Sequence, residues 1–416
     1  MQTQAGDPGA FAHFDLSRVD TPAFVVDAAK LRENCRILAE IRDEADIKML
    51  SALKAFSMWS TAPIIGQYLD GVCTSGLWEA RLASEFYDGE ISTYCAAYKP
   101  DELEEVARLS DHVIFNSPGQ MQRAALILEQ ARASGGAFDV GLRINPQVPT
   151  GEGPRYDPSS PGSRLGFPLD QLTPEHMEGV DGIHFHNLCE QGFEPLHRTW
   201  DKVFDAIEPW FGQLKWINMG GGHHITRADY EREELIEFLR DAKEDTQAEI
   251  YLEPGEAVAL DAGILVGTIL DTGENDGPFA ILDISATCHM PDVIEAPYRP
   301  AMLGEGSAHE SPREGGGLPQ AGTTPAPVPA FAGTQPMVRL GGPSCLAGDV
   351  IGEYALPVPN EPGQRIAFLD QAHYSMVKTN TFNGVPLPSI WLWDSETDAL
   401  ECVKRFGYEE FRNRLS

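Results

Sequence analysis

Between residues 47 and 255, eight short apolar runs alternate with longer, charged stretches that carry apolar residues at helical spacing. Each run ends in small or polar residues, as strands of a parallel sheet do when a helix follows each strand. Eight such units predict a closed (β/α)8 barrel of the TIM-like type. The runs are 47–55, 71–74, 91–95, 112–116, 140–145, 182–186, 216–219 and 249–252.

The pattern changes after about residue 260. The runs 264–270, 279–284, 365–369 and 389–393 are separated by Gly, Pro and Asp instead of helices, which predicts a C-terminal antiparallel β domain. The strand-like run 23–26 precedes a helical stretch (28–44) and is expected to join this domain. We therefore predict a barrel domain at 28–262 and a β domain built from 1–27 and 263–416. Within the latter, 303–336 is poor in large apolar groups and is expected to be a mobile surface insertion.

Composition narrows the classes of function. The 31 Lys and Arg against 63 Asp and Glu give a formal charge of −32, which repels nucleic acid and attracts cations, or simply maintains solubility. No apolar run approaches membrane-spanning length. The first residues show no secretory or transit signal, and the seven cysteines form no CxxC pair. We expect a cytoplasmic protein without a disulfide framework or a structural zinc site.

Barrel enzymes place their catalytic groups where the strands end, so the ends of the runs are candidate positions. Lys54 ends the first run inside an apolar stretch; a desolvated lysine has a depressed pKa and is a good Schiff-base nucleophile, whereas an isolated one more often reaches out to solvent. Gly220, Gly221 and Gly222 follow the seventh run, and their backbone N–H groups can surround a phosphate, although such a run can also be only a tight turn. Glu253 ends the eighth run, where it can hold a pyridine nitrogen protonated or lie solvated in a loop.

Together with His186, which ends the sixth run, these residues form the set that a pyridoxal phosphate site requires. Their order resembles the alanine-racemase-fold (fold type III) pyridoxal-phosphate-dependent decarboxylases, which include the ornithine, arginine and diaminopimelate enzymes. The resemblance extends from about Thr21 to the C-terminus, apart from 303–336. The segments that carry it are Thr21-Pro22-Ala23, Ala52-Leu53-Lys54-Ala55, Ser75-Gly76-Leu77-Trp78-Glu79, Ser163-Arg164-Leu165-Gly166-Phe167, Gly342-Pro343-Ser344-Cys345 and Phe382-Asn383-Gly384.

The resemblance implies further roles. It places His186 on the face of the cofactor ring, Arg164 near the ring, and Cys189 and Tyr374 at the phosphate. It also implies a homodimer in which the loop that carries Cys345 and Asp349 enters the partner's active site.

One departure bears on the substrate. Ornithine and diaminopimelate decarboxylases usually have arginine where this chain has Glu256, and arginine would suit a phosphate or a carboxylate. Glu256, with Asp292 and Asp349, is better suited to the ammonium groups of a polyamine, and Glu190 is either a further amine contact or a structural acid. The resemblance is therefore strongest to the branch that converts carboxynorspermidine or carboxyspermidine to norspermidine or spermidine, with diaminopimelate or ornithine decarboxylation as the alternative.

In the expected mechanism, the substrate amine displaces Lys54 from the cofactor, carbon dioxide leaves, and Glu253 keeps the ring protonated. Cys345 then protonates the carbanion. Three rival functions are weaker. A metal-dependent hydrolase would use His184 and His186, of which we expect one to point away from the barrel interior, and it leaves Lys54 and the cysteine loop unexplained. A non-catalytic cofactor carrier would lack the β domain, and the cysteine loop argues against alanine racemization.

Overall fold

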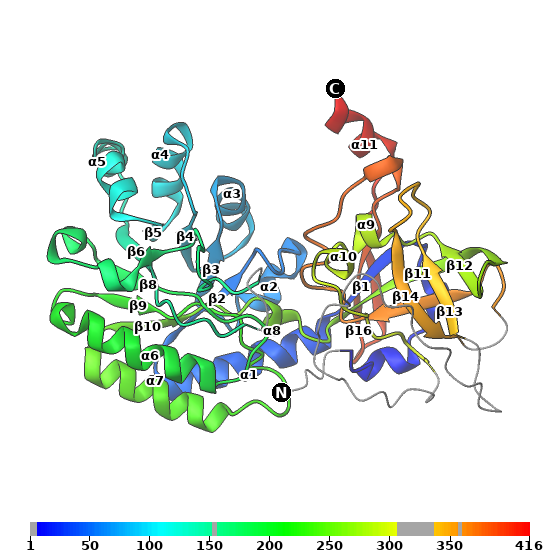
Figure 1. The fold of residues 1–416 in the computed structure, drawn as a ribbon, viewed down its shortest axis with the longest axis horizontal. Coiled ribbons are helices and arrows are strands. Elements are labelled where there is room, and N and C mark those ends of the chain that lie inside the picture. Colours follow the sequence, from blue (N-terminus) through cyan, green and yellow to red (C-terminus); the bar gives the residue numbers. More distant parts are fainter. Residues whose placement is uncertain (1–5, 152–155, 306–336, 357–359) are drawn as a thin grey trace.

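The computed structural model describes residues 6–151, 156–305, 337–356 and 360–416. Two bodies lie side by side, a barrel with helices around it and a strand-rich domain (Figure 1). The predicted insertion lies almost wholly outside the described residues, since 306–336 are not described. Within the described ranges, no helix is both long and apolar enough to cross a membrane.

A closed 8-stranded parallel barrel forms the first body, as the alternating runs predict. Each run forms a strand in its predicted place, and pairing between the first and last strands closes the barrel. The strands are β2 (Lys48–Ala52), β3 (Gly71–Thr74), β4 (Glu90–Tyr94), β5 (His112–Phe115), β6 (Asp139–Asn145), β8 (Gly182–His184), β9 (Trp216–Asn218) and β10 (Glu249–Leu252). The two-residue strand β7 (Phe167–Pro168) pairs outside the ring with β6.

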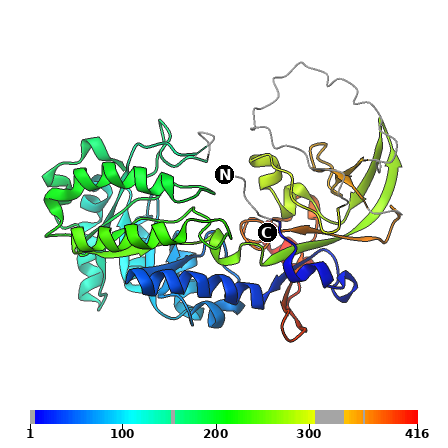
Figure 2. The ribbon, with the colours of Figure 1, turned by 90° about the horizontal axis from the view of Figure 1, so that it is seen from below.

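Helices cover the outside of the barrel (Figures 1 and 2). They bury apolar faces against the strands, and the helical stretch expected at 28–44 forms a helix at 28–45. Their bounds are α1 (Ala28–Ala45), α2 (Ala62–Ile65), α3 (Leu77–Phe86), α4 (Pro100–Leu109), α5 (Pro118–Ala133), α6 (Glu194–Ile207), α7 (Arg232–Thr246) and α8 (Glu256–Ala259).

One end of the barrel is filled by Trp216, at the start of β9. Its ring approaches Gly141 and Gly182 so closely that an added Cβ would lie 2.5 Å and 2.1 Å from ring atoms. Because bulky groups occupy this end, polar side chains gather where the strands finish.

The second body is a mixed sheet with the strand order β14, β13, β12, β11, β1, β16, β17, and β15 pairs with β11. As expected, β1 joins it, antiparallel to β11. The strands are β1 (Ala23–Asp27), β11 (Gly263–Glu274), β12 (Pro278–Leu282), β13 (Met337–Gly341), β14 (Val350–Ala355), β15 (Arg365–Leu369), β16 (Ser389–Asp394) and β17 (Ala399–Lys404). The helices of this body are α9 (Ala286–His289), α10 (Asp292–Glu295) and α11 (Tyr408–Leu415).

Most pairs in this sheet are antiparallel, as expected, but β1 pairs with β16 and β12 pairs with β13 in parallel, so the sheet is mixed. Parallel neighbours need a long connection. The chain supplies one between β12 and β13 through α9, α10 and the segment after them, and almost the whole chain separates β1 from β16. The division at 27/28 and 262/263 stays a proposal; the change from barrel to mixed sheet falls between α8 and β11.

Candidate active site

Lys54 follows β2, whose end is tied to two neighbouring strand ends. The Ala52 N–H donates to the Pro254 carbonyl (2.9 Å) and the Leu53 N–H to the Cys73 carbonyl (3.1 Å). The Lys54 side chain is accessible to solvent, although protein groups surround it at the barrel mouth. Desolvation lowers the pKa of Lys54, and Arg143 lowers it further. The lysine is therefore held toward the neutral amine, the form that attacks carbonyl groups.

His186 lies against this amine, with its Nε2 3.4 Å from Nζ of Lys54. The Gly221 N–H donates to Nδ1 of His186 (3.0 Å), so in a neutral ring the proton resides on Nε2. Desolvation, followed by Lys54 and Arg143, lowers the pKa of His186 well below its usual value. The imidazole is therefore a neutral, oriented group beside the lysine.

Glu253 directly follows β10 and is ionised inside the barrel. Its Oε2 lies 3.2 Å from Nε2 of His184, and Nδ2 of Asn218 donates to its Oε1 (2.8 Å). Burial acts to raise the pKa of Glu253, but His184 and Asn218 outweigh it and lower the pKa to about 2. Lys54, His184, His186, Asn218 and Glu253 are called the ring-end group below.

His184 and His186 both face the barrel interior, so the expectation that one points away is wrong. Residues two apart on a strand share a face, because side chains alternate. One imidazole serves Glu253 and the other contacts Lys54.

Arg143, on β6, is a site residue that sequence reasoning missed. It is only 5% exposed, donates to the His186 carbonyl (3.0 Å) and stacks over the Tyr94 ring at 4.4 Å. Arg164, predicted to lie near the cofactor ring, is exposed, and its backbone carbonyl accepts a hydrogen bond from Asn116. The signal for Arg143 was a basic residue inside an apolar run, the same signal that identified Lys54.

The glycine turn packs so closely that side chains cannot replace its hydrogens. A Cβ on Gly221 would lie 2.0 Å from the Glu253 carbonyl oxygen, and Gly220 and Gly222 have φ of +71° and +89°. The Gly220 N–H already donates to Asn218 and the Gly221 N–H to His186. The turn therefore positions the ring-end group. Two of the three N–H groups that were expected to surround a phosphate already donate to side chains of the protein.

Cys189 and Tyr374 approach from opposite sides of the domain boundary. Cys189 follows β8 beside Gly222, and burial raises the pKa of its thiol to about 12. The Tyr374 N–H donates to the carbonyl of Ala55, the residue after Lys54 (2.8 Å). Burial raises the pKa of Tyr374, and the nearby Glu256 and Cys189 act in the same direction. This hydrogen bond anchors the β domain next to the lysine.

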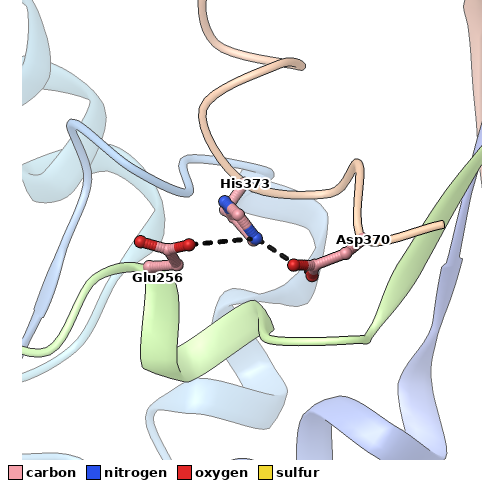
Figure 3. A group of neighbouring side chains, drawn as sticks. All are labelled: Glu256, Asp370 and His373. Carbon is pink, nitrogen blue, oxygen red and sulfur yellow. Dashed lines mark ion pairs between the residues drawn. The ribbon is translucent and has the colours of Figure 1, made fainter. Parts of the chain in front are cut away.

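Glu256 lies between two imidazoles. Its Oε2 is 3.2 Å from Nε2 of His224, and its Oε1 is 3.6 Å from Nε2 of His373, which is also 3.0 Å from Oδ1 of Asp370 (Figure 3). Glu256 and His224 come from the barrel, whereas Asp370 and His373 come from the loop after β15. His224, Glu256, Asp370 and His373 are called the interdomain cluster below.

Charge alternates through this cluster. Burial opposes ionisation, but the two histidines lower the pKa of Glu256 to about 2, and Asp370 and Glu256 raise the pKa of His373 to about 10. Ligand atoms of Glu256, Asp370 and His373 lie within 4.8 Å of one another, a spacing that suits a cation. The His373 imidazolium already supplies that positive charge.

Comparison with known proteins identifies the family. A model described as "Pyridoxal-dependent decarboxylase, C-terminal sheet domain" matches residues 23–372. The chain belongs to the pyridoxal-dependent decarboxylases. It is 36% identical to the carboxynorspermidine/carboxyspermidine decarboxylase of Campylobacter jejuni, over 95% of this chain and 99% of the relative. It is also 36% identical to the carboxyaminopropylagmatine decarboxylase of Synechocystis, over 96% of each chain.

A solved structure supports the same fold. The crystal structure of carboxynorspermidine decarboxylase complexed with norspermidine, from Campylobacter jejuni, matches with a TM-score of 0.82 at 36% identity, covering 95% of this chain and 100% of that chain. Diaminopimelate decarboxylase from Helicobacter pylori shares the fold, with a TM-score of 0.74 at 18% identity. The barrel and mixed sheet are therefore those of a fold type III decarboxylase.

The residues present fit pyridoxal phosphate, the cofactor of this decarboxylase family. Lys54 offers an amine for attachment, and Glu253 offers an ionised carboxylate for a ring nitrogen. Among the described residues, the Gly222 N–H, the Tyr374 hydroxyl and Nδ1 of His224 have no hydrogen-bond partner. Donors of this kind are what a phosphate needs.

In this decarboxylase, the loop that carries Cys345 is held by Asp349. The buried Asp349 carboxylate accepts from the hydroxyls of Ser285 (2.9 Å) and Ser344 (2.6 Å), and the Cys345 N–H donates to Oδ1 of Asn383 (2.7 Å). Cys345 itself is exposed. Within the described ranges, no hydrogen bond or ion pair joins this loop to the barrel, so Asp349 positions the loop, and its predicted contact with substrate stays a prediction.

Asp292, the remaining predicted amine contact, begins α10. It forms an ion pair with Lys378, whose Nζ also lies 2.9 Å from Oε2 of Glu295. Two carboxylates thus surround one ammonium group. Asp292 and Glu256 each already have a cationic partner in the chain. Their predicted contacts with the amines of a substrate therefore stay predictions.

Proposed function

We propose that this decarboxylase converts carboxynorspermidine, carboxyspermidine or both to norspermidine or spermidine. The observation that carries the proposal is the 36% identity, over nearly the full length, to a decarboxylase named for these substrates. The structural match to an enzyme complexed with norspermidine adds support. Diaminopimelate decarboxylation is less supported, because the Bacillus subtilis enzyme is only 24% identical.

A different cationic tail is the second candidate. The Synechocystis relative, also 36% identical, is named for carboxyaminopropylagmatine, which ends in a guanidinium group instead of an amine. Both candidates combine a carboxylated end, which reacts, with a cationic tail. The two substrates therefore need the same chemistry at Lys54 and differ only in how the tail is bound.

Different residues of the chain have different roles in the reaction. Pyridoxal phosphate, when bound, withdraws electrons from the carbon that loses its carboxylate. Lys54 would hold the cofactor through its amine, His186 would contact the ring, and Glu253 would keep a proton on the ring nitrogen. Each oxygen of Glu253 keeps a lone pair free after bonding to His184 or Asn218.

Glu190 is the carboxylate best suited to the cationic tail. The neighbouring Glu256 carboxylate and burial raise the pKa of Glu190, although His224 and His373 act to lower it, so its ionised form is only partly compensated. An ammonium or guanidinium group at this position would supply the missing positive charge. Asp292 would serve the tail only if the tail replaced Lys378, which brings the same chemical group.

We further propose a homodimer in the cytoplasm, with Cys345 of one subunit acting at the Lys54 of the other. All seven cysteines are free thiols, which suits a reducing compartment. The exposed Leu346 and Phe382 flank the Cys345 loop and offer apolar surface to a second subunit. A thiol held near the reacting carbon can return a proton to it.

The decisive experiment is an absorbance spectrum followed by carbon dioxide release from a substrate panel. We expect a cofactor band that vanishes in Lys54→Ala, and release from carboxynorspermidine or carboxyspermidine at a kcat/KM at least about a hundredfold above that for ornithine and diaminopimelate. Preference for carboxyaminopropylagmatine would select the second candidate. Preference for diaminopimelate or ornithine would overturn the proposed substrate class.

Mixing two inactive variants tests the shared site. If Cys345 serves the partner's Lys54, Lys54→Ala and Cys345→Ala subunits should form mixed dimers with one intact site, restoring up to about a quarter of the wild-type activity. Cys402→Ala, on β17, is the control that should be active alone. No recovery in dimers shown by mass to be mixed would contradict the shared site.

A further inference from the structure

The phosphate side of the site holds a carboxylate that should repel the cofactor. Glu256 acts electrostatically on both Cys189 and Tyr374, the two side chains predicted to lie at the phosphate. The structure compensates this charge by pairing Glu256 with His224 and His373.

His224 lies where a positive charge on its ring would be close to the glycine turn. It follows Gly222 by two residues, is 1% exposed, and directs Nε2 to Glu256 at 3.2 Å. Both ring nitrogens are buried and have no hydrogen-bond partner among the described residues; Nε2 lies within ion-pair distance of Glu256, whereas Nδ1 has no ion-pair partner either. A charged imidazole carries a proton on both nitrogens, so this arrangement leaves one buried N–H donor for another group.

The surroundings of His224 favour its charged form. Burial opposes protonation, but Glu256, followed by Glu190 and Asp370, raises the pKa of His224. The next imidazole, His223, is different: burial lowers its pKa to about 3, and its Nδ1 lies 2.6 Å from the Tyr230 hydroxyl. Of the two histidines after the turn, His224 is therefore the one whose surroundings favour a positive charge.

We infer that His224, held charged by Glu256, is the cation that offsets the phosphate of pyridoxal phosphate at the Gly222 end of the glycine turn, and that Glu256 is its positioning residue. The inference rests on the proposed phosphate position and not on the substrate. A carboxylate near a phosphate would ordinarily weaken phosphate binding. Here Glu256 strengthens it, because Glu256 keeps His224 charged.

The test compares two ligands on the full-length protein stripped of cofactor. Pyridoxal phosphate and pyridoxal differ only in the phosphate, so the ratio of their dissociation constants isolates binding at that end. We expect Glu256→Gln to weaken pyridoxal phosphate about tenfold, a loss of about 1.4 kcal/mol, and to leave pyridoxal unchanged. His224→Gln, which keeps a donor and removes the charge, should have the same effect, and the double variant should be no weaker than either single one.

The controls separate this inference from general damage. Glu105→Gln removes a half-buried carboxylate that is paired with Arg81 on the outside of the barrel and should leave the ratio unchanged. Tighter binding of pyridoxal phosphate by Glu256→Gln would overturn the inference, because it would mean simple repulsion. Equal weakening of both ligands would also overturn it. Should Glu256→Gln fail to fold, His224→Gln decides alone. A wrong substrate proposal would alter carbon dioxide release and not this ratio.

Discussion

Glu253 and Glu256 stand three residues apart, and each carboxylate lies 3.2 Å from an imidazole nitrogen, yet they belong to differently built regions. The ring-end group around Glu253 comes from barrel strand ends and the residues that follow them. The interdomain cluster around Glu256 joins α8 and the residue His224, after the glycine turn, to a loop of the β domain. Figure 3 shows the part formed by Glu256, Asp370 and His373. The first region depends on the closure of the barrel, and the second on the docking of two domains.

The difference teaches what each carboxylate can do. Glu253 accepts from the neutral amide of Asn218 and contacts His184, whose pKa desolvation lowers, so its negative charge is available to a ring nitrogen. Glu256 lies between two imidazoles whose pKa values are raised, so its negative charge is compensated within the protein. We therefore expect chemistry from the first region, and binding and stability from the second.

Replacement of Glu253 is expected to have the largest effect of the changes that distinguish the two carboxylates. Glu253→Gln keeps the shape and the bond from Asn218 but removes the charge that holds the ring proton. We expect kcat to fall at least about a hundredfold at saturating cofactor, measured by carbon dioxide release. Glu105→Gln is the matched control. If Glu253→Gln weakened cofactor binding without slowing turnover, the two carboxylates would act alike and the distinction would fail.

Cys345 tests whether chemistry also comes from the β domain. Cys345→Ala should slow product formation about a hundredfold and divert part of the turnover to transamination, because the carbanion loses its proton donor. Product analysis by mass spectrometry measures both effects, with Cys402→Ala as control. An unchanged rate would remove Cys345 from this role and leave the chemistry to the barrel alone.

Gly221 links the ring-end group to the turn. In Gly221→Ala the added Cβ would lie 2.0 Å from the Glu253 carbonyl, a backbone atom that cannot rotate away. We expect a loss of about 1–3 kcal/mol in the free energy of unfolding, measured in urea. Gly212→Ala is the control, since nothing lies within 4 Å of its Cβ position. Equal stability of the two variants would show that the turn can shift.

Most of the barrel could be predicted from the sequence because its strands are buried on both faces. Buried parallel strands form nearly continuous apolar runs, and Gly, Asn and charged helices mark their ends. The strands β13, β14 and β17 were missed because exposed residues interrupt each of them, and β17 has no buried residue. The direction of pairing was also missed for β1 and β16, since local pattern carries no information about partners far apart in the chain.

The candidate site divides in the same way. Lys54, His186 and Glu253 could be predicted because strand ends of a barrel converge. Arg143 was missed since a buried arginine contradicts the usual cost of burying charge, and its partners come from other strands. The links from Glu256 to His224 and His373 could not be predicted, because they depend on how the β domain docks.

The alkaline stability of the interdomain cluster is the smallest expected effect. The pKa of His373 is about 10 in the folded protein and about 6.5 when unfolded. Its contribution is therefore complete below about pH 6.5 and is lost as pH rises toward 10. Asp370, Glu256 and Glu190 are the charged groups that raise this pKa, and Tyr374 packs against its ring.

We expect His373→Asn to be about 1–2 kcal/mol less stable than wild type at pH 7, and this difference to narrow by pH 10, measured by urea unfolding across that range. The variant keeps a polar side chain, so the narrowing reports the proton and not the volume. Lowering the pH should act through Glu256 instead, whose contribution is lost only below about pH 4.5, as its pKa is about 2. A difference that stayed constant from pH 7 to 10 would mean that His373 is neutral in the folded protein, and the interdomain cluster would then be held by packing and not by charge.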